Sequence, residues 1–114
     1  MKIRLFAMAL MLAGCATDPA PHVQMSLADQ ALTQAKAAGV DEQNDAFRRA
    51  LKHYELAYKN MLEQDFKRAR MLAEKAELEA RVAELQTLKD KDQAYLKVLV
   101  GDIARIREAL EAKQ

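Results

Sequence analysis

The chain has 114 residues and a formal net charge of +1 at pH 7, with 18 basic and 17 acidic side chains. Because nucleic-acid binding and adhesion to anionic lipids both depend on excess Lys and Arg, this balance argues against either partner. With one cysteine in the chain, no intramolecular disulfide can form, so packing must stabilise the fold. The many Ala, Leu, Glu, Lys, Arg and Gln residues, with 3 Gly and 2 Pro, predict an all-α protein.

The first 14 residues have the organisation of an export signal. A basic start precedes an apolar run over 5–12, which is well short of the roughly 20 residues that a membrane-spanning helix needs. The sequence Leu-Ala-Gly-Cys at 12–15 resembles the lipobox of bacterial lipoproteins. The resemblance implies that residues 1–14 are a lipoprotein signal peptide, cleaved between Gly14 and Cys15, and that the Cys15 thiol is acylated. Several acyl chains would anchor the protein stably, since each buried CH₂ contributes about 0.8 kcal/mol.

Residues 15–24 are expected to connect the acylated cysteine to the fold as a tether. Pro19 and Pro21 fix φ and disfavour helix in the residues before them, so this tether should be extended and semi-rigid. In bacterial lipoproteins an Asp directly after the acylated cysteine retains many at the inner membrane, and here that position is Ala16. The resemblance therefore implies the periplasmic face of the outer membrane, with the inner membrane as the alternative.

Residues 25–80 are expected to fold as a short helix followed by an Ala-rich antiparallel helical hairpin. Ser26 is the predicted N-cap of the first helix, and Gly39 is its predicted end, because glycine readily takes the left-handed conformation there. Asp41 is the predicted cap of the second helix. Apolar residues recur along that helix at three-and-four spacing and predict one buried stripe: Phe47, Ala50, Leu51, Tyr54, Ala57, Tyr58, Met61 and Leu62.

The turn between the second and third helices is harder to place, because no Gly or Pro occurs between Val40 and Val100. Asp65 is the predicted cap of the third helix. Gln64 would then take a left-handed backbone conformation, which glycine adopts at a cost lower by about 1 kcal/mol. One uninterrupted helix from Asp41 onward is the alternative. If the turn forms, the third helix should bury Phe66, Ala69, Leu72, Ala73, Ala76 and Ala80.

Residues 81–114 are expected to extend the last helix as a coiled-coil-like arm. From Leu78 onward the spacing of apolar residues alternates between three and four, as on a coiled-coil seam. A helix from Phe66 to near Ala112 would be about 70 Å long, and this small chain has nothing left to cover its second half. The uncovered seam is therefore the predicted partner-binding surface, with Leu85, Leu88, Leu96, Leu99, Ile103 and Ile106.

The Ala-rich segment also resembles a known family. The tether, the ending Ala-Ala-Gly-Val at 37–40 and the pattern Gln-Asp-Phe-x-x-Ala-x-x-x-Ala-x-x-Ala at 64–76 are similar to the domain of unknown function 4398 family of small envelope lipoproteins. That family usually has glycine where this chain has Gln64. The resemblance implies a helical hairpin in the envelope and supplies no catalytic residues.

Residues suited to catalysis or metal binding are scattered along the chain. His53 has no second metal ligand among its helical neighbours, and His22 lies in the tether, whereas a zinc site needs three or four converging ligands. Thr17 and Ser26 have no adjacent His to activate them, and no Gly-rich phosphate-binding loop is present after the leader. The sequence therefore predicts no enzyme, no cofactor and no metal.

Together these patterns predict a noncatalytic, membrane-anchored lipoprotein that acts as a helical scaffold or protein-interaction module in the bacterial cell envelope. The expected partners are the membrane, through the lipid on Cys15, and either further copies of the chain or another envelope protein. The alternative is a periplasmic ligand-handling module that holds a peptidoglycan fragment or a lipid between its helices. Tyr54, Tyr58 and Phe66 are the side chains that would line such a groove.

Overall fold

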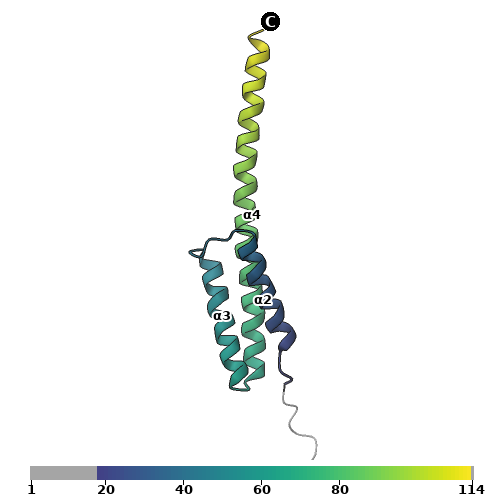
Figure 1. Ribbon diagram of the computed structural model, residues 1–114, viewed down its shortest axis with the longest axis vertical. Coiled ribbons are helices and arrows are strands. Elements are labelled where there is room, and N and C mark those ends of the chain that lie inside the picture. Colours follow the sequence, from purple (N-terminus) through teal and green to yellow (C-terminus); the bar gives the residue numbers. More distant parts are fainter. Residues whose placement is uncertain (1–17, 114) are drawn as a thin grey trace, which may run out of the picture.

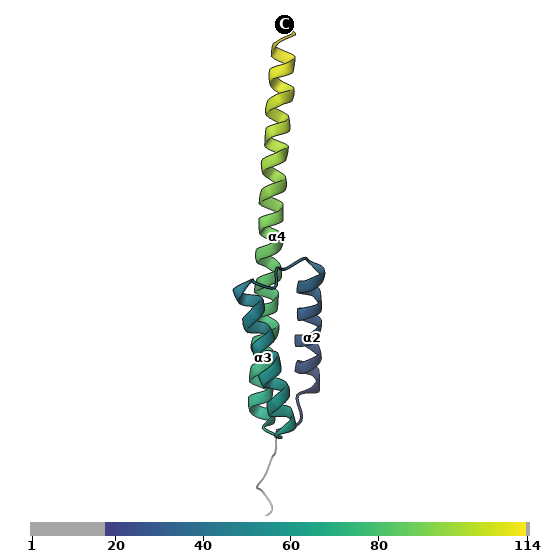
Figure 2. The same ribbon diagram turned by 60° about the vertical axis from the view of Figure 1, so that its left-hand side comes forward.

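The computed structural model describes residues 18–113 and arranges them as helices joined by short turns (Figure 1). The helices are α2 (His22–Ala37), α3 (Asp45–Leu62) and α4 (Phe66–Glu111). α2 and α3 lie along the first half of α4, whereas the second half of α4 extends alone beyond them (Figures 1 and 2). The predicted fold class, an all-α hairpin with a short first helix and a long last helix, is confirmed. The predicted signal peptide, Gly14 and Cys15 lie outside the described residues.

α2 begins at His22, before the predicted start at Ser26. Pro21 occupies the N-cap position with a fully buried ring, and no side chain caps the helix. Proline suits a helix start because it has no N–H group to leave unpaired. The prediction of Ser26 as the N-cap is therefore wrong, and residues 22–24 of the predicted tether are helical.

α2 ends in a left-handed turn at Gly39, as predicted. Gly39 has a φ of +82°, and the Val40 N–H donates to the Ala35 carbonyl oxygen at 3.1 Å. This hydrogen bond satisfies a carbonyl group in the last turn of the helix, and it returns the Val40 side chain to the core, where it is buried.

α3 ends in the same way, although the left-handed residue is Gln64. Gln64 has a φ of 60°, and the Asp65 N–H donates to the Asn60 carbonyl oxygen at 2.9 Å. The Asp65 carboxylate then accepts from the Arg68 N–H at 3.1 Å and caps α4. The predicted turn is confirmed, and the alternative of one uninterrupted helix from Asp41 onward is wrong.

The cap of α3 is Asn44 rather than the predicted Asp41. The Asn44 side-chain oxygen accepts from the Phe47 N–H at 3.0 Å. The Asp41 carboxylate instead accepts from the Gln43 N–H at 2.7 Å and shapes the connection before the helix. The helix starts later than predicted, and its first turn buries Ala46 and Phe47.

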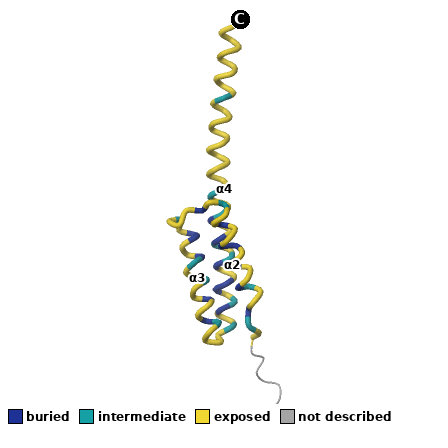
Figure 3. Tube along the Cα trace, viewed as in Figure 1, coloured by how far each residue is buried: buried dark blue, intermediate teal, exposed yellow. Residues whose placement is uncertain are grey.

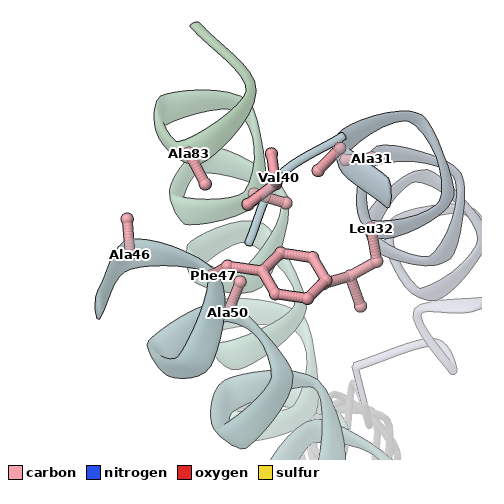
Figure 4. Close-up of a cluster of buried hydrophobic side chains, with 9 residues drawn as sticks. Ala31, Leu32, Val40, Ala46, Phe47, Ala50 and Ala83 are labelled. Carbon is pink, nitrogen blue, oxygen red and sulfur yellow. The ribbon is translucent and has the colours of Figure 1, made fainter. Parts of the chain in front are cut away.

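The core between the three helices consists largely of alanine. Phe47 is its large aromatic side chain, fully buried beside Leu32 and Val40 near the top of the bundle (Figure 4). Small side chains let helix axes approach within about 8 Å. Of the predicted second-helix stripe, Tyr58 and Leu62 are exposed rather than buried. The fully buried alanines are Ala28, Ala35, Ala50, Ala57, Ala69, Ala73, Ala76, Ala80 and Ala83.

Candidate interaction surface

The second half of α4 is surrounded by solvent. From Leu88 to Lys113 every residue except Asp102 is exposed (Figure 3). The packed part of the helix ends with Ala83, three residues beyond the predicted end of the hairpin segment. All six predicted partner-binding residues are exposed, with between 41% and 65% of their surface accessible: Leu85, Leu88, Leu96, Leu99, Ile103 and Ile106.

The exposed apolar surface is longer than the six predicted residues, because it continues along the first half of α4 on the side away from α2 and α3. Met71, Leu78 and Val82 are 49%, 63% and 45% exposed, although they lie where α2 and α3 cover α4. At 3.6 residues per turn they fall about half a turn away from the buried alanines Ala76 and Ala80. They therefore join the exposed arm residues in one surface, here named the apolar stripe: Met71, Leu78, Val82, Leu85, Leu88, Leu96, Leu99, Ile103, Ile106 and Leu110.

Charged residues interrupt the apolar stripe near the middle of α4. The run Lys89-Asp90-Lys91-Asp92 is helical throughout and fully on the surface. Within it, the Lys91 Nζ donates to the Ala38 carbonyl oxygen at 2.6 Å, beside the end of α2. A lysine at this place satisfies a helix-terminal carbonyl and favourably meets the negative end of the α2 dipole.

A polar cluster that the sequence did not reveal joins α3 to α4. The Arg49 Nε donates to Glu79 Oε1 at 3.1 Å, and His53 Nδ1 lies 2.6 Å from Glu79 Oε2. The His53 and Glu79 side chains are only 24% and 23% exposed. The Glu79 carboxylate thus contacts Arg49 and His53, which lie on successive turns of α3. These contacts fix the side of α3 that faces α4. Because these residues are far apart in the sequence, no local pattern could have indicated the cluster.

The aromatic residues proposed for a ligand groove have separate roles. Tyr54 is half-buried and packs against both groups of core side chains. Burial, the Asp29 carboxylate and Tyr58 together raise the pKa of the Tyr54 phenol. Tyr58 is 57% exposed, and Phe66 is half-buried at the first residue of α4. Tyr54 is thus part of the core, and Tyr58 lies on the surface.

Two hollows in the described surface each lie on the outside of a single helix. One is lined by Asp45, Arg48, Arg49 and Lys52 of α3, and another by Gln93, Leu96, Lys97 and Val100 of α4. Within residues 18–113, no three metal-ligating side chains are grouped so that they could hold a metal ion. None of the described helices combines the length and the apolar character that crossing a membrane requires.

These features define a class of protein: a small all-α module in which an Ala-packed bundle carries a solitary helical arm. Among solved structures the chain is similar to a DUF4398 family protein from Pseudomonas aeruginosa PAO1, with 40% sequence identity and a TM-score of 0.81. The match covers 84% of this chain and 100% of that chain. The chain therefore belongs to the DUF4398 family, which is the domain of unknown function 4398 family that its sequence resembles. No family model and no curated protein matches it.

Proposed function

We propose that the protein is a noncatalytic lipoprotein of the bacterial envelope that uses α4 as a protein-interaction surface. The observation that carries this proposal is the apolar stripe. Monomeric proteins rarely expose apolar side chains along so long a helix, and exposed apolar surface flanked by charged residues is typical of an interaction site. Burying a single Leu or Ile contributes about 1.5–3 kcal/mol, so a partner that covers several of these residues gains substantial affinity.

The proposed anchor is the lipid on Cys15, on the periplasmic face of the outer membrane. Its support is the Leu-Ala-Gly-Cys sequence at 12–15, preceded by the short apolar leader. α2 starts at His22, so only a few residues separate the lipid from the bundle. The anchor would thus hold the bundle close to the bilayer, and the arm would present its stripe to other proteins.

A scaffold is favoured over a ligand carrier because of how the bundle is packed. The side chains between the helices are mostly alanine, which leaves little space between the helix axes. Among the described residues, no buried side-chain polar atom lacks a hydrogen-bond partner and so none awaits a ligand. The hollows described above open on outer surfaces rather than between the helices.

The test places charge on the stripe. The variant that combines Leu99→Glu with Ile103→Glu should lose association, because two carboxylates would have to be buried against apolar partner surface. Sedimentation of the full chain in detergent and crosslinking in intact envelopes provide the measurements. The matched control combines Ala94→Glu with Val98→Glu, which are exposed residues on another face of the same helix. If the stripe variant keeps the oligomeric state and crosslinked partners of the wild type, α4 is not the interaction surface.

A further inference from the structure

We propose that the apolar stripe binds a second copy of α4 in antiparallel orientation, with the register set by Lys89 and Asp92. This inference rests on the proposed function, in which the stripe is an interaction surface, and it names the partner. The argument starts from the heptad positions of the stripe. Eight of its residues occupy two alternating core positions of a coiled coil: Val82, Leu96, Ile103 and Leu110 at position a, and Leu78, Leu85, Leu99 and Ile106 at position d.

The same heptad register places both charges of the interruption in the seam. Lys89 falls at position a and Asp92 at position d, and both are exposed in the structure. Between Leu78 and Leu110 these are the two seam positions that are not apolar. Charged residues at core positions of a coiled coil specify register and orientation, at a cost in stability. Lys89 and Asp92 therefore discriminate between the possible pairings of two arms.

A parallel pair brings identical residues together. Lys89 would face the partner's Lys89, and Asp92 would face the partner's Asp92, each between apolar layers. Like charges opposed in an interface are strongly unfavourable. In an antiparallel pair position a faces position d, so that Lys89 faces the partner's Asp92, and the two-fold symmetry forms the same ion pair twice. The charge pattern therefore favours the antiparallel orientation.

Aligning Lys89 with the partner's Asp92 fixes every other layer of the seam. Leu85 then faces the partner's Leu96, Val82 faces the partner's Leu99, and Leu78 faces the partner's Ile103. Each of these three layers is apolar on both sides, and the next layer outward places Ile106 beside the partner's Lys75. The register that pairs the charged residues therefore also keeps apolar residues together in the layers beside them.

The residues that flank the seam agree with the same alignment. At the flanking g position, Leu88 lies beside the partner's Tyr95, and Arg81 lies beside the partner's Asp102. In the single chain, Arg81 pairs with Glu77, whose side chain is 19% exposed, and Asp102 pairs with the exposed Arg105. The Arg81 and Asp102 side chains are themselves 52% and 44% exposed, so both can be reached by a partner helix.

The bundle leaves room for this partner. Leu78, Val82 and Leu85 are exposed because they lie on the side of α4 away from α2 and α3. Figures 1 and 2 show both of those helices gathered along the first half of α4. Since Lys89 and Asp92 lie near the middle of the 46-residue helix, two antiparallel α4 helices overlap along most of their length. The two bundles then lie at opposite ends of the pair.

Charge reversal tests the register in the full chain, purified in detergent and followed by sedimentation. Lys89→Asp places carboxylates against the partner's Asp92 twice and should raise the dimer Kd by at least about tenfold. Adding Asp92→Lys to the same chain exchanges the two charges and should return the Kd to near the wild-type value. In a parallel pair the double variant still opposes like charges, so a failure of this restoration would overturn the antiparallel register. Lys97→Asp, off the seam, is the matched control.

Disulfide capture tests the same register independently of charge. A chain with Leu85→Cys mixed with a chain with Leu96→Cys should form a crosslinked pair rapidly, because these positions face each other. Leu96→Cys alone should crosslink slowly, since its two copies would stand about 16 Å apart along the helix axes. Rapid crosslinking of Leu96→Cys with itself would show a parallel pair and overturn the inference. The wild-type chain controls for any contribution of Cys15.

The two proposals fail differently. The antiparallel pair is overturned if the wild-type chain stays monomeric at concentrations up to hundreds of micromolar and the Leu85→Cys and Leu96→Cys chains do not crosslink to each other. If such a monomer still crosslinks in envelopes through Leu99 and Ile103 to a different protein, the proposed function stands without this partner. If the charged stripe variant matches the wild type in every measurement, both proposals are wrong. Helical content by circular dichroism confirms that each variant is folded.

Discussion

Gln64 adopts a left-handed backbone conformation at the turn between α3 and α4, with a φ of 60°. A side chain in this conformation costs roughly 1–2 kcal/mol relative to the right-handed one, whereas glycine adopts either readily. The hydrogen bond from the Asp65 N–H to the Asn60 carbonyl oxygen depends on this geometry and maintains it. The turn therefore forms despite its central residue.

Replacing this residue by glycine should stabilise the protein. We expect Gln64→Gly to raise the free energy of unfolding by about 0.5–1 kcal/mol. Glycine relieves the backbone strain of the folded state, and this gain exceeds the stabilisation of the unfolded chain by the greater conformational entropy of glycine. Urea unfolding followed by circular dichroism measures the difference. Gln64→Ala is the control, since it keeps a Cβ atom in the same conformation and should change little. A clear loss of stability in Gln64→Gly would contradict the strained turn.

At the scale of the elements, the close packing of the helices depends on small side chains. Ala76 is fully buried in the core, with Ala57 and Met25 in the same cluster. We expect Ala76→Leu to lower the free energy of unfolding by about 1–3 kcal/mol or more, because the added methylene groups must separate the helices.

Thermal unfolding of the full chain in detergent checks this expectation. Ala94→Leu, which makes the same change on the exposed arm, should leave the unfolding of the bundle unchanged. An Ala76→Leu variant as stable as the wild type would mean that the bundle expands without cost, which is incompatible with a close-packed interior.

Local signals predicted the helix ends that depend on nearby residues. Gly39 and the Asp65 cap follow from rules about single turns, and the structure confirms both. The start of α3 was misplaced, because Asp41 and Asn44 are both good caps. In the structure Asn44 caps the helix by accepting from the N–H of the buried Phe47, and the rule for caps does not distinguish these two residues.

The apolar stripe was predictable only in part, because part of it depends on packing between segments that are far apart in the sequence. The six residues of the arm follow from heptad spacing and are all exposed. That Leu78 and Val82 continue the stripe depends on which side of α4 the other helices cover, which is a property of the assembled bundle. Predicting the contact of Glu79 with Arg49 and His53 likewise requires knowledge of which side of α3 faces α4. Contacts between distant segments therefore set the limit of the sequence prediction.

At the scale of the whole molecule, the proposed membrane attachment depends on one side chain. We expect Cys15→Ala to abolish acylation and to release or mis-sort the protein, because the acyl chains are its proposed anchor. None of the described helices has the length and apolar character to cross a membrane. Fractionation of cells that express the variant provides the measurement, with the wild-type chain in parallel. Retention of the variant in the membrane fraction after detergent-free washing would rule out lipid anchoring at this residue.

The first residues of α2 and of α4 lie at the same end of the bundle (Figure 1). In the antiparallel pair proposed above, the two chains therefore enter from opposite ends of a rod about 70 Å long. The seven residues from Cys15 to Pro21 span at most about 25 Å when fully extended. If each Cys15 carries the proposed lipid, two tethers of this length could not both reach one bilayer while the rod stands perpendicular to it. The pair would then lie parallel to the membrane surface. A straight, rigid pair of helices in this position would oppose strong bending of the membrane.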